Sequence, residues 1–137
     1  MKIYVACPLN SILRAQGLAR TLTHRGHTIA STWHTRPSST IEDERHLTRD
    51  QERAIADLCL LEIASADRLV VMWQNNGRCG HLFEAAFAVG QGMRVDAFPV
   101  YGGDLEDGKL PTILLRSRFV HSWRDEREFL AKLGGDT

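Results

Sequence analysis

The sequence lacks an excess of charge of either sign. Its 17 Lys and Arg residues are balanced by 17 Asp and Glu residues, so the formal net charge at pH 7 is zero. Proteins that bind nucleic acid or an anionic membrane surface through electrostatics carry a basic excess, which is missing here. We therefore expect neither partner, although a few local donors would suffice to hold a small anionic ligand.

Long apolar runs and paired cysteines are also scarce. No apolar run approaches the roughly 20 residues that cross a bilayer. The opening residues 1–7 (MKIYVAC) have no small-residue cleavage site behind them, so they are typical of a strand and not of a signal peptide. Cys7, Cys59 and Cys79 are an odd number without metal-ligand spacing, which argues against a disulfide framework. We expect a cytoplasmic protein whose residues 1–137 form a single domain.

Apolar runs and helical stripes alternate along the chain. The runs predict strands at residues 2–6, 27–33 (HTIASTW), 68–73 (RLVVMW), 95–101 and 118–121. The stripes predict a helix that starts near Asn10 and Ser11 and ends at Arg25-Gly26, and further helices at 47–65, 81–91 and 123–133. The first helix should bury Leu13, Leu18 and Leu22, and the second Ile55, Leu58, Cys59 and Leu61.

This alternation predicts an α/β Rossmann-like (flavodoxin-like) three-layer sandwich around a mainly parallel sheet. Sheets of this kind bind ligands in the crevice beyond the carboxyl ends of their strands. Three segments should line that crevice: residues 7–11, 33–36 and 74–84.

Glu84 is the most informative residue in these segments. It lies four positions after Gly80, in the first turn of the helix that follows the buried strand 68–73. The helix dipole and the free backbone N–H groups there favour an ionised carboxylate. Such a carboxylate, facing the crevice, can attack an anomeric carbon. The alternative is a glutamate that serves only to start the helix.

The residues around Glu84 form a pattern with other parts of the chain. Asp67 precedes the buried strand, Gly80 lies four residues before Glu84, and Gly92 lies eight residues after it. Together with residues 2–9 (KIYVACPL) and 28–34 (TIASTWH), this order and spacing resemble the nucleoside 2-deoxyribosyltransferase family, which includes nucleoside monophosphate N-glycosidases. The likeness extends over nearly the whole chain.

The resemblance implies that Glu84 forms a covalent glycosyl intermediate and that Tyr4 donates a hydrogen bond that orients its carboxylate. The family also has an acid on the preceding helix, at the position that Cys59 occupies here. Asp57 is the nearest carboxylate and a catalytic candidate, but two residues rotate a side chain by about 200° on a helix, so it cannot occupy the same place. The acid is therefore either shifted or missing. Two family glycines are also replaced, by Ala86 and by Cys7.

The remaining predicted contacts are with the substrate. Asn10, Ser11 and Arg14 follow the first strand at a helix start, where a phosphate or sugar hydroxyl can bind. Trp33 and His34 are candidates for stacking on a base. Further candidates are Cys7, Gly80, Arg78 and, from a neighbouring subunit, Arg116 or Ser117. Helix capping, surface charge and ordinary packing are the alternatives for these residues. The six histidines lack metal-ligand pairing, so we expect neither a metal nor another cofactor.

The expected function is cleavage of the N-glycosidic bond of a (deoxy)nucleoside 5′-monophosphate or nucleoside, by hydrolysis or by base exchange. Two displacements at the anomeric carbon would retain its configuration. The resemblance also implies a homodimer or larger homo-oligomer. Two alternatives stay open: a catalytically inactive nucleotide-binding or sensor module of the same fold, and an NAD glycohydrolase.

Overall fold

The computed structural model describes residues 1–35, 46–75, 79–101, 110 and 113–134. Across these residues runs a five-stranded sheet in the order β2-β1-β3-β4-β5, in which all neighbouring strands are parallel. The strands are β1 (Lys2–Ala6), β2 (Thr28–Ile29), β3 (Arg68–Trp73), β4 (Arg94–Pro99) and β5 (Val120–Ser122).

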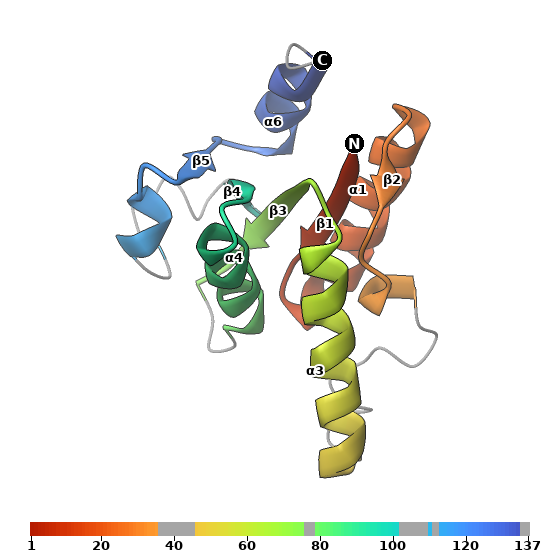
Figure 1. The fold of residues 1–137 in the computed structure, drawn as a ribbon. Helices are drawn as coiled ribbons and strands as arrows, with labels where there is room; N and C mark the ends of the chain where they lie inside the picture. Colours follow the sequence, from red (N-terminus) through yellow and green to blue (C-terminus); the bar gives the residue numbers. More distant parts are fainter. Residues whose placement is uncertain (36–45, 76–78, 102–109, 111–112, 135–137) are drawn as a thin grey trace.

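Helices cover both faces of the sheet (Figure 1). One face packs against α1 (Ile12–His24) and α6 (Glu126–Leu133), the other against α3 (Arg49–Ala64) and α4 (Gly80–Gly90). Three short 3₁₀ helices connect these elements: η1 (Leu9–Ser11), η2 (Trp33–Thr35) and η3 (Ile113–Arg116). The arrangement confirms the predicted α/β Rossmann-like sandwich.

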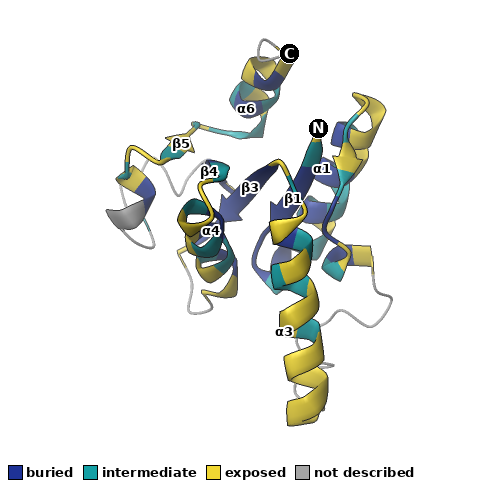
Figure 2. Cartoon of the chain, viewed as in Figure 1, coloured by how far each residue is buried: buried dark blue, intermediate teal, exposed yellow. Residues whose placement is uncertain are grey.

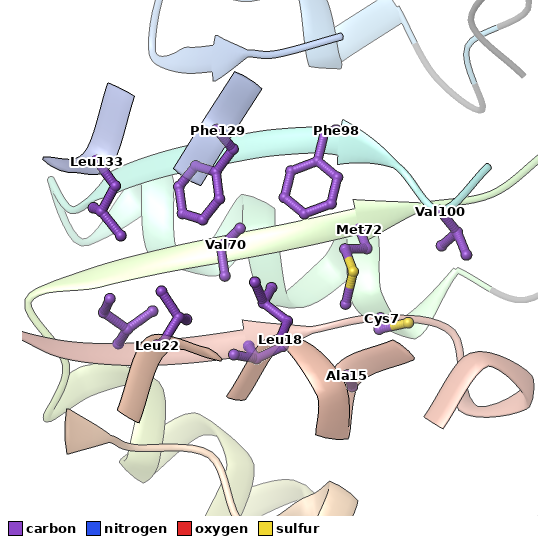
Figure 3. Packing of buried hydrophobic residues seen from close by; sticks show 12 residues of the cluster. Cys7, Ala15, Leu18, Leu22, Val70, Met72, Phe98, Val100, Phe129 and Leu133 are labelled. Atoms are coloured by element: carbon purple, nitrogen blue, oxygen red, sulfur yellow. The ribbon is translucent and has the colours of Figure 1, made fainter. Parts of the chain in front are cut away.

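The two faces follow from the alternation of side chains along a strand. In β1, Ile3 and Val5 point into the layer with α1 and α6, whereas Tyr4 and Ala6 point toward α3 and α4. Figure 3 shows the first layer, in which the rings of Phe98 and Phe129 stack with their centroids 5.5 Å apart. The alternation therefore places Tyr4 beneath the helix that carries Glu84.

Glycines in the left-handed region end two of the helices. Gly26 follows α1 with φ of 89°, and Gly92 follows α4 with φ of 74°. Residues with a Cβ rarely adopt this conformation, so glycine is the usual residue there. The ends of α1 and α4 therefore lie at the glycines where the sequence predicted them.

The second predicted strand is wrong in length. Only Thr28–Ile29 pair with β1, and the chain then turns into η2 instead of continuing to Trp33. The backbone N–H of Ala30 still donates to the carbonyl of Ile3. Two residues further along β1, the N–H of Val5 donates to the Ser31 hydroxyl and not to a backbone carbonyl. A side-chain hydrogen bond thus takes the place of the next backbone hydrogen bond between β1 and β2, and β2 ends there.

Two expectations about buried helix faces are also wrong. Leu13 is 77% exposed because it lies off the stripe formed by Ala15, Leu18 and Leu22. In α3 the buried residue is Ile63, whereas Leu58 and Leu61 are exposed. Figure 2 shows that the amino-terminal part of α3 projects beyond the sheet and is largely exposed, whereas Leu61, near the carboxyl end, lies on the side of the helix away from the buried Ile63.

A buried ion pair ties together the amino ends of β3 and β4. Arg68 donates to both carboxylate oxygens of Asp96, one of them at 3.1 Å, and both side chains are almost fully buried. The indole N–H of Trp123 donates to the same carboxylate at 2.8 Å. The charge of Asp96 is therefore surrounded by donors, which offsets the cost of burying it.

Candidate active site

Tyr4 and Glu84 meet between β1 and α4. The phenol O–H of Tyr4 donates a short hydrogen bond to Oε2 of Glu84, 80 residues later in the chain. Tyr4 is fully buried and Glu84 partly buried. Glu84 lies one turn into α4, on the same side as the buried residues His81, Ala85 and Ala88. The carboxyl is thus neither free in solvent nor sealed inside the core.

Burial dominates the electrostatics of this pair. It raises the pKa of Glu84 to about 7, with a further increase from the charge of Glu62 and an opposing decrease from the Tyr4 hydrogen bond. Burial is also the largest cause of the raised pKa of Tyr4, followed by the charge of Glu84, so Tyr4 stays a donor. At neutral pH Glu84 is consequently poised between its acid and its anion.

Cys59 and Asp57 lie on different faces of α3, as their spacing predicts. Cys59 is half-buried and contacts Tyr4, where it contributes to the raised pKa of the phenol. Asp57 is exposed on the helix surface. The position expected to hold an acid is therefore filled by a thiol, and a catalytic role for Asp57 stays a prediction.

Glu62 is a residue of this site that the sequence analysis missed. It lies one turn after Cys59 on α3, and its Oε1 accepts a hydrogen bond from the backbone N–H of Thr32 at 3.3 Å. Its charge acts on Glu84, as described above, and on His34. The signal was present in the spacing, because residues three apart share a helix face.

His81 is a second residue that was missed. It is 3% exposed, and neither ring nitrogen has a hydrogen-bond partner in the described ranges. Burial lowers its pKa to about 4, so the ring is neutral at pH 7. Histidines at the second position of a helix are common, and nothing in the local sequence signals this burial.

The three residues predicted to hold a phosphate differ in their contacts. Ser11 occupies the N-cap position of α1, but its buried hydroxyl caps no backbone N–H and has no partner within the part of the chain that the structure describes. Arg14 is engaged instead, because it donates to Glu126 at 3.2 Å and to the carbonyl of Val100 at 3.4 Å. Asn10 is exposed in η1. Ser11 is thus the hydroxyl left open at this helix start.

Trp33 and His34 are held by the fold around them. The indole N–H of Trp33 donates to the carbonyl of Val5 at 2.8 Å. The buried ring of His34 pairs with the Ser31 hydroxyl at 2.9 Å and forms one wall of a cavity of about 620 Å³ beside α1. Glu84 is not among the residues that line this cavity. Stacking of either ring on a base stays a prediction.

The other predicted contacts have local explanations. Cys7 is 5% exposed within the core shown in Figure 3, and burial raises the pKa of its thiol to about 12. Ser117 accepts a hydrogen bond from the N–H of Phe119 at 3.2 Å. Gly80 begins α4 and is exposed, with open space where a Cβ would lie. Arg78 lies outside the described residues.

The described ranges contain neither a cluster suited to a metal ion nor a membrane-spanning helix. Within them, no three His, Cys, Asp or Glu side chains gather closely enough to hold a metal ion. No helix in those ranges is both long and apolar enough to span a membrane.

Comparison with known proteins identifies the fold. No family model and no curated protein matches this chain. Among solved structures, the CMP N-glycosidase BcmB of Clostridium botulinum is similar, with a TM-score of 0.60 and 16% sequence identity over 98% of this chain and 98% of that chain. The similarity spans both proteins almost from end to end, and it confirms the resemblance seen in the motifs at the level of the fold.

Proposed function

We propose that this chain cleaves the N-glycosidic bond of a (deoxy)nucleoside 5′-monophosphate or nucleoside through a covalent glycosyl-Glu84 intermediate. The observation that carries the proposal is the pair formed by Tyr4 and Glu84. A carboxyl held by a buried phenol presents its other oxygen in a fixed direction. Glu84 would attack C1′ as the bond to the base breaks, and water or a second base would then release the sugar.

Tyr4 serves this chemistry in two ways. Its hydrogen bond fixes the orientation of the carboxyl, and it lowers the pKa of Glu84 against the larger effect of burial. The ionised fraction of Glu84 at neutral pH is therefore larger than burial alone would permit. A partly dehydrated carboxylate is also the more reactive nucleophile.

A nucleoside 5′-monophosphate is the substrate class we favour. The buried Ser11 hydroxyl has no partner among the described residues, and it lies at the start of α1, where the helix dipole attracts anions. The similar protein BcmB is named for a nucleoside monophosphate, CMP. The Ser11 hydroxyl supports a phosphate site at this helix, with Arg14 close by but engaged by Glu126, and the similarity to BcmB supports a nucleotide as the substrate.

The proposal is tested by incubating the protein with nucleosides, nucleoside 5′-monophosphates and NAD, and by separating the products chromatographically. We expect free base from a monophosphate and none after Glu84→Ala. Release of nicotinamide from NAD would instead identify a NAD glycohydrolase, and saturable binding without turnover would identify an inactive nucleotide-binding module. Adding a second base to the reaction distinguishes base exchange from hydrolysis.

The covalent step has its own test. A nucleotide with fluorine at C2′ destabilises the oxocarbenium-like transition state and slows release of the sugar. Mass spectrometry of the digested protein should then find the sugar phosphate on the peptide that contains Glu84. An adduct on any other residue contradicts the assignment of the nucleophile.

A further inference from the structure

The site has a nucleophile but no assigned proton donor for the departing base. A nucleobase leaves poorly as an anion, so an acid within reach would normally protonate it. The expected helix position holds Cys59, and Asp57 points to solvent. Among the described groups that act on Glu84, the second carboxyl is Glu62.

The position of Glu62 suits this task. It lies near the end of α3, the helix that packs against α4, and it shares a face with Cys59, which contacts Tyr4. The N–H of Thr32 donates to one of its oxygens at 3.3 Å, and the other oxygen has no hydrogen-bond partner among the described residues. Thr32 follows β2, next to β1, which carries Tyr4. Glu62 and Glu84 therefore approach the space above β1 from two neighbouring helices.

The electrostatics couple the two carboxyls. Two like charges in a partly buried site repel, and the charge of Glu62 raises the pKa of Glu84. The other titratable groups around the pair are Tyr4, which donates to Glu84, Cys59 on α3, and His34, whose ring is bonded to Ser31. Transfer of a proton from Glu84 to Glu62 leaves the charge on Glu84 and supplies both an acid and a nucleophile.

We propose that Glu62 is the proton-transfer residue of this site, an inference that rests on the proposed function. In the first step Glu84 bonds to C1′, the electrons of the C1′–N bond pass to the base, and Glu62 gives the base its proton. In the second step water bonds to C1′, gives a proton to Glu62, and releases Glu84 as a carboxylate. The sum is substrate plus water giving free base plus sugar phosphate.

Leaving-group dependence provides the sharpest test. The variants are Glu62→Gln, which keeps the acceptor for Thr32, and Glu62→Asp, which keeps the acid. The substrates are a nucleoside monophosphate and 4-nitrophenyl riboside 5-phosphate, whose nitrophenolate leaves without a proton. We expect Glu62→Gln to lose about 100-fold or more in kcat/KM on the nucleotide, while its first turnover of the nitrophenyl substrate stays near the wild-type rate. Glu62→Asp should cleave both substrates more slowly than the wild type, with the same preference between them.

The second step and the pH profile give independent readouts. Without Glu62 as a base, the sugar should accumulate on Glu84, and azide should restore turnover by forming the glycosyl azide. Removing the charge of Glu62 should also move the rising limb of the pH profile to lower pH, because that charge raises the pKa of Glu84. Circular dichroism checks that each variant is folded.

Each result decides between the two proposals. Glu52→Gln changes an exposed acid on the same helix and should leave both rates intact. Equal losses on both substrates by folded Glu62→Gln, or no loss on the nucleotide, would overturn the role of Glu62 while leaving cleavage by Glu84 standing. If the wild-type protein cleaves neither substrate, the proposed function itself is wrong.

Discussion

At the scale of single residues, Glu84 combines two opposed requirements. A nucleophile must be ionised, yet burial favours the neutral carboxyl and raises its pKa to about 7. The hydrogen bond from Tyr4 works against burial, because it lowers the same pKa. The balance between burial and this hydrogen bond sets the pH above which Glu84 is ionised.

Tyr4→Phe tests this balance. Losing the hydrogen bond should raise the pKa of Glu84 further, so the rising limb of kcat/KM against pH should move above pH 7. A shift of one pKa unit, from about 7 to about 8, would reduce the ionised fraction of Glu84 and hence activity at pH 7 by about fivefold, with recovery at pH 8.5. An unchanged profile would show that the phenol does not act on the carboxyl in solution.

Glu84→Gln tests the cost of the same charge to stability. In the unfolded chain Glu84 loses its proton near pH 4.5, but in the fold it does so only near pH 7. The free energy of unfolding of the wild type should therefore fall as pH rises from 4.5 to 7. Glu84→Gln removes this loss, so it should be more stable than wild type by up to about 3 kcal/mol at pH 8 and by much less at pH 5. Urea unfolding at the two pH values measures the difference.

The sequence identified part of this site through chain order and part not at all. The pair of Tyr4 and Glu84 could be predicted because strand alternation and helix start each orient one side chain. The spacing from Cys59 indicates only that Glu62 lies on the same face of α3, and its approach to Glu84 depends on how α3 crosses Thr32, which is a tertiary contact. The burial of His81 depends likewise on the packing of α4 against the sheet.

At the scale of secondary structure elements, the strongest patterns were the most reliable. The apolar run of β3 and the glycine after α4 gave correct elements, because each depends on local chemistry. The predicted length of the second strand was wrong because the Ser31 hydroxyl accepts the hydrogen bond that a backbone carbonyl would otherwise accept. The prediction of the buried residues of α3 was wrong because the periodicity of a sequence shows which side of a helix is apolar, not whether another element covers that side.

The end of α4 offers a matched pair of substitutions. Gly92→Ala should lower the free energy of unfolding by about 1 kcal/mol, because φ of 74° disfavours a Cβ although open space surrounds it. Gly90→Ala, at the last residue of the same helix and equally unobstructed, should raise it by about 0.5 kcal/mol. Denaturant unfolding of both variants measures this contrast. Similar effects at the two positions would show that backbone conformation does not decide the outcome.

At the scale of the whole molecule, exposed apolar side chains lie on the face made by α3 and α4. Leu58, Leu61 and Phe83 are 42%, 68% and 64% exposed, respectively. Large exposed apolar groups on one face often mark an interface. Together with the implied homo-oligomer, this leads us to expect that the face contacts a second copy of the chain.

Sedimentation of the purified protein tests the assembly. We expect a dimer or larger species for the wild type and a shift toward monomer for Leu61→Glu combined with Phe83→Glu. Leu13→Glu provides the control, because Leu13 is equally exposed but lies on α1, across the sheet. Dissociation by the control alone, or a monomeric wild type, would contradict the expectation.

The fold treats its two inward-facing carboxylates in opposite ways. Asp96, on the face of the sheet that packs against α1 and α6, is surrounded by donors from Arg68 and Trp123, whereas Glu84, against the opposite face, has one phenol and a repelling neighbour. The sheet therefore separates a neutralised anchoring charge from the charge proposed to react. Substitutions on α3 and α4 that aim to alter the proposed substrate preference should leave the contacts of Asp96 intact, because those contacts lie across the sheet.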